Sequence, residues 1–238
     1  MNDNVILSAK DLVRDYGKGE NKFRALDHVS LNINKGESVA IIGKSGSGKS
    51  TLMHLLALLD RPTEGEISVN GINAERLRPK QLNILRNKTY GFVFQQFFMN
   101  AHNSVLENVE LPLKIAGVGV RERRKLALKA LEIVDLTAKA KNKATDLSGG
   151  QKQRVCIARA IVNNPSVIFA DEPTGNLDSN TGKKVEDLLF SFAKAGRTLV
   201  LVTHDIDLAK KCDRAIHIRD GKIVEEIREK SKISGVKL

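Results

Sequence analysis

A glycine-rich segment in the first quarter of the chain has residue types and spacing that suit phosphate binding. Residues 43–50 read Gly-Lys-Ser-Gly-Ser-Gly-Lys-Ser and match the pattern GxxxxGK[ST]. Glycine lets successive backbone N–H groups turn inward around phosphate oxygens, while Lys49 would reach the β- and γ-phosphates and Ser50 would ligate Mg²⁺. Thr51 could touch the α-phosphate. The residues predicted to bind a nucleoside triphosphate are Gly43, Lys44, Ser45, Gly46, Ser47, Gly48, Lys49, Ser50 and Thr51.

Two carboxylates follow a short apolar segment later in the chain. Val167–Ala170 runs directly into Asp171 and Glu172, and a buried parallel strand delivers polar side chains at its carboxyl end. Because adjacent residues at a strand end point in different directions, Asp171 suits the Mg²⁺ shell and Glu172 suits polarising an attacking water. A strand ending in Asp-Glu is often an ordinary polar turn, but the phosphate-binding pattern favours the catalytic interpretation.

Strands and helices must position these residues, and the apolar pattern predicts both. Predicted strands are Val5–Leu7, Ala25–Ile33, Glu37–Ile42, Gly65–Asn70, Val167–Ala170 and Thr198–Val202, and a hairpin joins Ala215–Ile218 to Lys222–Glu226 through Asp220-Gly221. Predicted helices are Leu52–Leu59, beginning near Lys49, then a helix from Ser148 toward Val162, and Thr181–Ala195. The stretch from Pro79 to Val134 has helical character, most clearly in Arg121–Val134.

The alternation of short apolar strands with helices predicts an α/β fold with a mostly parallel core. An antiparallel β subdomain would come first, and residues 95–146 would form a helical subdomain inserted into the core. The core would comprise residues 1–94 and 147–226 of a single domain spanning residues 1–238. The last residues, 227–238, would be a basic, frayed tail.

The composition is that of a globular, basic chain. It has 39 Lys plus Arg against 28 Asp plus Glu, a net charge of +11, and 41% hydrophobic residues, which excludes collagen-like and disordered classes. The charge favours anionic partners, but a well-solvated surface explains it equally well. Aromatic residues are only 4% and Trp is absent, so base-stacking platforms for nucleic acid are not expected.

No targeting or membrane segment is expected from the sequence. No run approaches the roughly 18 consecutive apolar residues of a membrane helix, and the start lacks a charged region followed by a long apolar run. Cys156 and Cys212 are too few and too far apart for a disulfide framework. These features predict a reducing, cytoplasmic location and a buried, inert thiol at Cys156.

The class of nucleotide hydrolase is decided by a further motif. A GTP-binding switch protein should carry NKxD, and Asn87-Lys88-Thr89-Tyr90 lacks the Asp. Leu147-Ser-Gly-Gly-Gln151, together with the phosphate loop, Asp171-Glu172 and His204, instead resembles the ATP-binding-cassette (ABC) ATPases. The resemblance covers the chain from about Val5 to Glu226 and identifies the P-loop NTPase core expected here, with ATP and Mg²⁺ as its ligands.

The resemblance implies a role for several single residues. Tyr16 looks like the aromatic residue that stacks on adenine, and Gln95 like the glutamine that senses Mg²⁺ and links core to helical subdomain. Glu172 resembles the catalytic base, and His204 the switch histidine that contacts the γ-phosphate. Asp178 resembles the carboxylate that crosses a dimer interface. The other histidines, His28, His54, His102 and His217, fit no motif.

The signature segment implies a second copy of the chain. Ser148, Gly149, Gly150 and Gln151 open a predicted helix, and a helix N-terminus binds anions. In this family that end faces the γ-phosphate held by the other subunit. The resemblance therefore implies a head-to-tail homodimer with ATP at its two identical interfaces. Ala144 and Asp146 depart from the residues that relatives often carry before this segment, which bears on its local path and not on its chemistry.

Further similarity suggests a branch and a partner. Residues 92–96, 106–112 and 171–178 are similar to ATPases of lipoprotein release, macrolide export and antimicrobial-peptide efflux. The implied partner is a separate membrane permease, docked near residues 95–146, so the chain would sit at the inner face of the cell membrane. An alternative is a cell-division-type ATPase that regulates a membrane partner without transport. Chromosome-structuring ATPases are disfavoured because residues 50–147 contain no sustained heptad run, and translation factors because only one cassette is present.

Overall fold

Residues 4–228 are described by a computed structural model, and the chain divides into two compact units. Unit 1 comprises the residues up to 82 and from 198 onward, and unit 2 comprises residues 83–197. The predicted basic tail lies, apart from its first two residues, outside the described residues. No helix among residues 4–228 has the length and apolar character needed to cross a membrane.

Unit 1 contains an antiparallel sheet built from alternating strands. Its strand order is β2 (Phe23–Asn34), β1 (Val5–Tyr16), β4 (Glu64–Val69) and β5 (Ile72–Asn73). The side chains of β2 alternate between buried and exposed along Leu26–Ile33, as expected for a sheet with one face on a core. This confirms the predicted N-terminal antiparallel β subdomain.

A parallel arrangement in unit 1 carries the phosphate-binding segment. The fully buried β3 (Ser38–Ile42) pairs in parallel with β8 (Thr198–Val202) on one side and β9 (Arg214–Arg219) on the other. The antiparallel β10 (Lys222–Ile227) completes the predicted hairpin with β9. The helices of unit 1 are α1 (Lys49–Leu56) and α7 (Ile206–Ala209). Parallel strands of this kind bring the loops after β3 and β8 to the same sheet edge.

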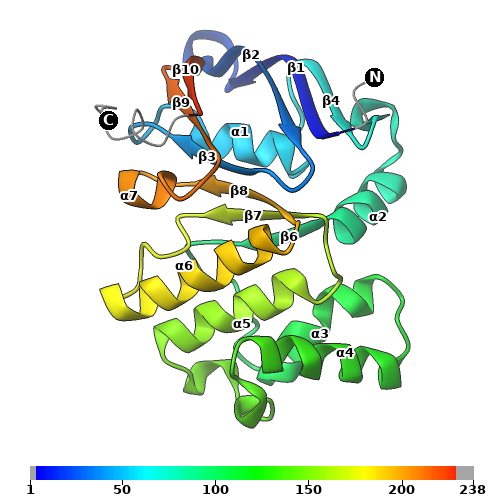
Figure 1. The fold of residues 1–238 in the computed structure, drawn as a ribbon. Coiled ribbons are helices and arrows are strands. Elements are labelled where there is room, and N and C mark those ends of the chain that lie inside the picture. The colour runs from blue at the N-terminus through cyan, green and yellow to red at the C-terminus, as the bar shows by residue number, and fades with distance from the viewer. Residues whose placement is uncertain (1–3, 229–238) are drawn as a thin grey trace. The chain divides into compact units, whose positions relative to one another are not determined.

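Unit 2 pairs two parallel strands with a set of helices. The strands are β6 (Tyr90–Val93) and β7 (Val167–Asp171). The helices are α3 (Val105–Ile115), α4 (Val120–Ile133), α5 (Gly149–Ile161) and α6 (Ser179–Lys194), and α2 (Pro79–Thr89) is the segment in which the chain passes from unit 1 to unit 2. In Figure 1, α3, α4 and α5 lie side by side, and all three pairs pack together. The fold is therefore α/β with a parallel core, as predicted.

Three details correct the sequence-based prediction. Residues 90–93 form a strand although they lie inside the stretch read as helical; parallel pairing of Tyr90 with Val167 and an edge-to-face contact with Phe169 stabilise it. Strand β1 runs nine residues beyond Leu7 to Tyr16, because bulges let it continue past polar residues such as Asp11 (φ 54°). The short elements β5 and α7 were not predicted.

Candidate nucleotide-binding and catalytic site

The phosphate-binding segment is the turn between β3 and α1. Helix α1 begins at Lys49, directly after Gly48, whose φ of 106° is accessible to few residues other than glycine. At Gly43 (φ 153°) an added Cβ would overlap the carbonyl oxygen of Ile218 and approach Ser47 Oγ to 2.7 Å. The backbone at both ends of the segment therefore requires glycine. The N-terminal N–H groups of α1 lie next to this turn, as predicted, and can meet an anion.

Two polar side chains in this turn suit a bound phosphate. Lys49 is buried, with 9% of its surface exposed, and its Nζ donates a hydrogen bond to the carbonyl oxygen of Lys44 at 2.8 Å. Ser47 is also buried, and its Oγ has no hydrogen-bond partner. A buried hydroxyl without a partner is unfavourable. The turn therefore has the form of a cradle whose polar groups a phosphate would satisfy.

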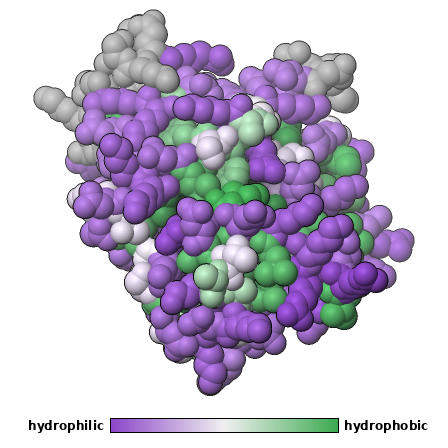
Figure 2. Space-filling model, turned by 60° about the horizontal axis from the view of Figure 1, so that its bottom comes forward, coloured by the Kyte–Doolittle hydropathy of each residue, from purple (hydrophilic) through white to green (hydrophobic). Residues whose placement is uncertain are grey.

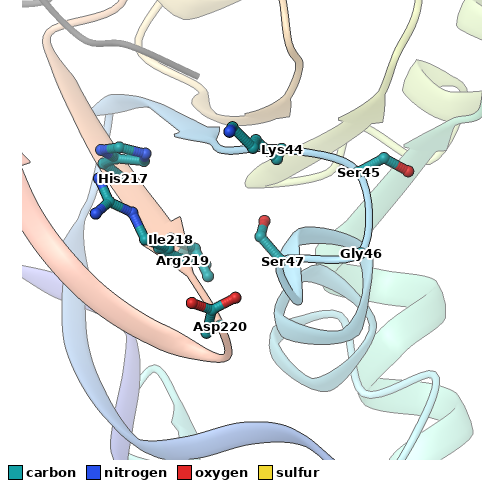
Figure 3. A pocket seen from close by; sticks show the side chains of 8 residues that line it. All are labelled: Lys44, Ser45, Gly46, Ser47, His217, Ile218, Arg219 and Asp220. Carbon is teal, nitrogen blue, oxygen red and sulfur yellow. The ribbon is translucent and has the colours of Figure 1, made fainter.

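A pocket of about 510 Å³ adjoins this cradle within unit 1. Figure 3 shows the β9–β10 turn facing the phosphate-binding turn across it. Its walls are Lys44, Ser45, Gly46 and Ser47 on one side and His217, Ile218, Arg219 and Asp220 on the other. Burial lowers the pKa of His217, and the charge of Arg219 adds to this effect. The imidazole is therefore neutral at pH 7, and the cations of the pocket are Lys44 and Arg219.

Tyr16 and His204, the other residues predicted to touch the nucleotide from unit 1, lie at strand ends. Tyr16 ends β1 with 37% of its surface exposed. His204 is exposed in the loop after β8. The next residue, Asp205, fixes that loop: its side chain caps α7 by accepting from the backbone N–H of Asp207 at 2.8 Å. An exposed imidazole on an anchored loop can reach a ligand.

In unit 2 the two predicted acids lie at the carboxyl end of β7. Asp171 is the last residue of the strand, and both acids are partly exposed. Glu172 has a φ of 43°, a left-handed conformation that is uncommon for glutamate. This conformation turns the chain directly after the strand. Gln153 of α5 anchors the turn by donating to the carbonyl oxygen of Pro173 at 2.7 Å.

The loop that carries Gln95 is tied to α5 by side chains that the sequence analysis did not identify. We call residues 94–98 the Gln95 loop. Its carbonyl oxygens accept hydrogen bonds from α5 as follows: Phe94 from Gln153 Nε2 at 3.3 Å, Phe97 from Cys156 Sγ at 2.9 Å and Arg159 Nη2 at 3.1 Å, and Phe98 from Arg159 Nη1 at 2.8 Å. Asn176 Nδ2 donates to Gln95 O at 3.0 Å. Gln153, Cys156 and Arg159 belong to no sequence motif. Their spacing of three residues along α5 is the one sequence signal that places them on the same face of the helix.

Cys156 is the buried thiol that the sequence analysis expected. It is 1% exposed, and burial raises its pKa to about 11. The thiol is therefore protonated at neutral pH and donates its hydrogen to the Gln95 loop. It supports this loop and is not a reactive nucleophile.

The signature residues open α5 with a reciprocal cap. Ser148 is the N-cap: its Oγ accepts from the N–H of Gln151 at 3.3 Å, and Gln151 Oε1 accepts from the N–H of Ser148 at 3.0 Å. Gly149 and Gly150 are the first two residues of the helix, whose N–H groups have no partner within it. Before this cap, Ala144 and Asp146 are the first and last residues of a short 3₁₀ turn. The departure noted in the sequence thus leaves the N-terminus of α5 intact.

Asp178 caps another helix. Its side chain accepts from the N–H of Thr181 at 3.1 Å, so it is the N-cap of α6, and hydrogen bonds from Thr181 lower its pKa. An aspartate at this position stabilises its own helix.

Comparison with known proteins decides the family. The family model described as "ABC transporter" matches residues 26–175. The chain belongs to the ABC transporter family. An uncharacterised ABC transporter ATP-binding protein of Methanocaldococcus jannaschii is 46% identical over 224 residues, which cover 94% of this chain and 100% of that protein. The matched region includes the phosphate-binding turn, Gln95, the signature and both acids.

The solved structures agree with this membership. The dimeric structure of MJ0796, described as a bacterial ABC transporter cassette, has a TM-score of 0.87 and 44% identity, covering 94% of this chain and 98% of that one. A post-hydrolysis form of the same cassette, bound to ADP and phosphate, matches equally well. The chain is therefore an ABC ATPase domain with the predicted fold.

Some curated relatives are much longer. The macrolide export ATP-binding/permease protein MacB of Hyphomonas neptunium is 48% identical over 221 residues, covering 93% of this chain and 34% of that protein. The corresponding protein of Neisseria meningitidis is 43% identical over 228 residues. The chain spans about a third of the length of these relatives.

Proposed function

We propose that this cassette binds and hydrolyses ATP with Mg²⁺ as one half of an ATP-dependent homodimer that drives a membrane permease. The observation that carries the proposal is the phosphate cradle, in which a buried lysine, an unpartnered buried hydroxyl and two required glycines surround the start of α1. Ser47 Oγ is buried and has no hydrogen-bond partner among the described residues. A phosphate oxygen would supply that partner.

The predicted roles are assigned by the chemistry of each side chain. Lys49 and the N–H groups of residues 43–51 would neutralise the phosphates, Tyr16 would stack on adenine, and His204 would contact the γ-phosphate. Ser50, Asp171 and Gln95 offer the hard oxygen ligands that Mg²⁺ requires, together with phosphate oxygens. When bound, Mg²⁺ would offset charge on the β- and γ-phosphates. Glu172 would orient and deprotonate the attacking water.

The signature supports the dimer. In α5, the cap satisfies Ser148 and Gln151, while the first N–H groups of the helix and its dipole remain available to an anion. A chain with one anion site at α1 and a second at α5 can bind two ATP molecules between two copies. The dimeric cassette structure is a relative with this assembly. Hydrolysis would remove the charge that joins the halves and so separate them.

A surface of unit 2 suits the permease. Large apolar side chains are exposed on the Gln95 loop, α3 and α4, with exposed fractions of 66% for Phe98, 66% for Ile115 and 69% for Val120. Figure 2 shows apolar groups breaking up an otherwise hydrophilic surface. We propose that these side chains belong to one apolar surface, because large contiguous apolar patches mark interaction sites. We propose that the permease docks here, with the cassette at the inner face of the membrane. The relatives named as macrolide export proteins support a role in export, and we propose an amphipathic substrate of the macrolide, antimicrobial-peptide or lipoprotein type.

Two measurements test these proposals. Glu172→Gln should retain ATP but fail to hydrolyse it, and with ATP and Mg²⁺ it should elute as a dimer by size exclusion with light scattering. The matched control, Glu172→Gln with Lys49→Ala, should stay monomeric. A monomeric Glu172→Gln protein that has bound ATP would contradict the dimer.

The permease is tested by expressing a tagged Glu172→Gln protein, solubilising the membranes in mild detergent with ATP present, and capturing the tagged protein with whatever is bound to it. A stoichiometric membrane protein supports the proposal, and purely soluble or nucleic-acid partners contradict it.

A further inference from the structure

Tyr16 is held in place by two charged residues. Its hydroxyl donates a hydrogen bond to Asp60 Oδ2 at 3.0 Å. Arg14 bonds the same carboxylate, with Nη2 2.9 Å from Oδ1 and 2.9 Å from Oδ2. The Arg14 guanidinium also lies over the Tyr16 ring, 4.4 Å from its centroid. The three side chains therefore form a closed set in which each contacts the other two.

Asp60 connects this set to the phosphate-binding helix. It lies in the turn between α1 and β4, and its N–H donates to the carbonyl oxygen of His54, in the last turn of α1, at 3.3 Å. The same turn is bound to β1 at Thr63, whose N–H donates to Val13 O at 2.7 Å and whose Oγ1 accepts from Asp15 N–H at 3.0 Å. Tyr16 is thus linked through Asp60 to the helix that begins at Lys49.

The Arg14 guanidinium lies over one face of the Tyr16 ring, and the residue as a whole remains partly exposed. Tyr16 is 37% exposed, while the side chains of Arg14 and Asp60 are 22% and 29% exposed. A guanidinium on one face of an aromatic ring fixes the ring plane and draws electron density from the other face. An electron-rich purine stacks well on such a face. A surface ion pair by itself contributes little to the stability of a protein. The Arg14–Asp60 pair matters here because it orients the Tyr16 ring.

We propose that Arg14 and Asp60 are positioning residues that fix the Tyr16 ring at a set distance from the phosphate cradle, so that the cassette distinguishes a purine nucleotide from a bare polyphosphate. The proposal rests on the proposed stacking of adenine on Tyr16. It assigns Asp60 no contact with the nucleotide. Its predicted signature is a loss confined to the base, with phosphate binding intact.

The test compares the binding of ADP, which carries the base, with the binding of pyrophosphate, which does not. Both are used in place of ATP so that hydrolysis does not disturb the measurement. Calorimetry measures both dissociation constants for wild type, Tyr16→Ala, Tyr16→Phe and Asp60→Ala. Asp60→Ala should raise the ADP dissociation constant about fivefold to tenfold, from the loss of a hydrogen bond and an ordered cation–π contact. Tyr16→Phe, which removes only the hydroxyl, should give a smaller rise of roughly twofold to fourfold. Pyrophosphate affinity should stay constant throughout.

A matched control is Asp27→Ala. Asp27 forms ion pairs with Arg24 at 3.0 Å and Lys222 at 3.0 Å in the same unit, without contacting Tyr16. It should leave both affinities unchanged. A second readout is tyrosine emission, since the chain has two Tyr and no Trp. ADP should quench emission from Tyr16, and in Asp60→Ala the quenching should need proportionally more ADP.

The outcomes separate the two assignments. If Tyr16→Ala leaves the ADP affinity unchanged, adenine does not stack on Tyr16 and the proposed role of that residue fails. If Tyr16→Ala weakens ADP binding but Asp60→Ala stays within twofold of wild type, the positioning role alone is overturned. An equal loss of ADP and pyrophosphate in Asp60→Ala also overturns it, because the effect would then reach the phosphate cradle.

Discussion

Arg159 offers a direct test of how the Gln95 loop is held. Its guanidinium donates to the carbonyl oxygens of Phe97 and Phe98 from one helix face. The Arg159→Ala variant loses both bonds and the 3.7 Å contact of Arg159 Nη2 with Cys156 Sγ. It should keep the α5 helix intact, because alanine is the best helix former. The Gln95 loop should then open more often, although Gln153 and Cys156 still hold its other carbonyl groups.

The size of the effect follows from the bonds removed. A hydrogen bond from a charged donor contributes about 1.5–3 kcal/mol, and partial exposure of Arg159 reduces the value for each bond. For the pair we take about 2 kcal/mol, which corresponds to a roughly 30-fold increase in the open population. Amide hydrogen exchange reports this population residue by residue. Exchange at residues 96–100 should therefore be about 30-fold faster in Arg159→Ala than in wild type.

The same helix supplies the control. Arg154 Nη1 donates to the carbonyl oxygen of Val134 at 2.9 Å, at the end of α4. Arg154→Ala should accelerate exchange around residues 134–138 and leave the Gln95 loop at its wild-type rate. Wild-type exchange of the Gln95 loop in Arg159→Ala, or equal acceleration of both segments in either variant, would refute the reasoning, since each arginine would then act on the helix as a whole.

Two other predictions concern unit 1. Lys49→Ala should abolish ATP binding in calorimetry because it removes the buried ammonium from the phosphate cradle, and retained micromolar affinity would refute the assignment of this turn. Burial lowers the pKa of His217 below its ordinary value of 6.5. As the pH falls, this imidazole therefore takes up a proton more readily in the unfolded state than in the folded state. Thermal stability should therefore fall as the pH drops below about 6.5, and His217→Gln should flatten that part of the curve; parallel curves for both proteins would contradict it.

The elements that the sequence predicted best are those with a strong local signal. Strand β8 has the predicted bounds, and the turn at Asp220-Gly221 joins β9 and β10 as expected. Strand β8 is a short run of apolar residues, and the hairpin has a specific turn pair at Asp220-Gly221. Strand β6 was missed because four residues carry too little pattern, and its stability comes from pairing with β7, which no local signal contains.

The sequence identifies the motif residues by their position along the chain, but it does not predict their backbone conformation or the side chains that support them. The position of Glu172 follows from the apolar run before it, whereas its φ of 43° depends on the turn that Gln153 anchors through Pro173. The Arg14–Asp60 pair likewise joins residues 46 positions apart. Long-range contacts between single polar side chains have no periodicity, so they become visible only when the chain is folded.

The two glycines of the signature illustrate how one motif meets two physical needs. At Gly150 an added Cβ would overlap Thr181 Cγ2 of α6, so glycine is required there for the packing of α5 on α6. At Gly149 the nearest atoms to an added Cβ are 3.9 Å away, on Leu177 and Phe97, so the fold itself would accept alanine. Glycine at this position is instead what a helix N-terminus needs for the close approach of a ligand to its N–H groups. The structure of a single chain therefore explains Gly150, whereas Gly149 is explained by the phosphate that we propose a second copy brings to this end of α5.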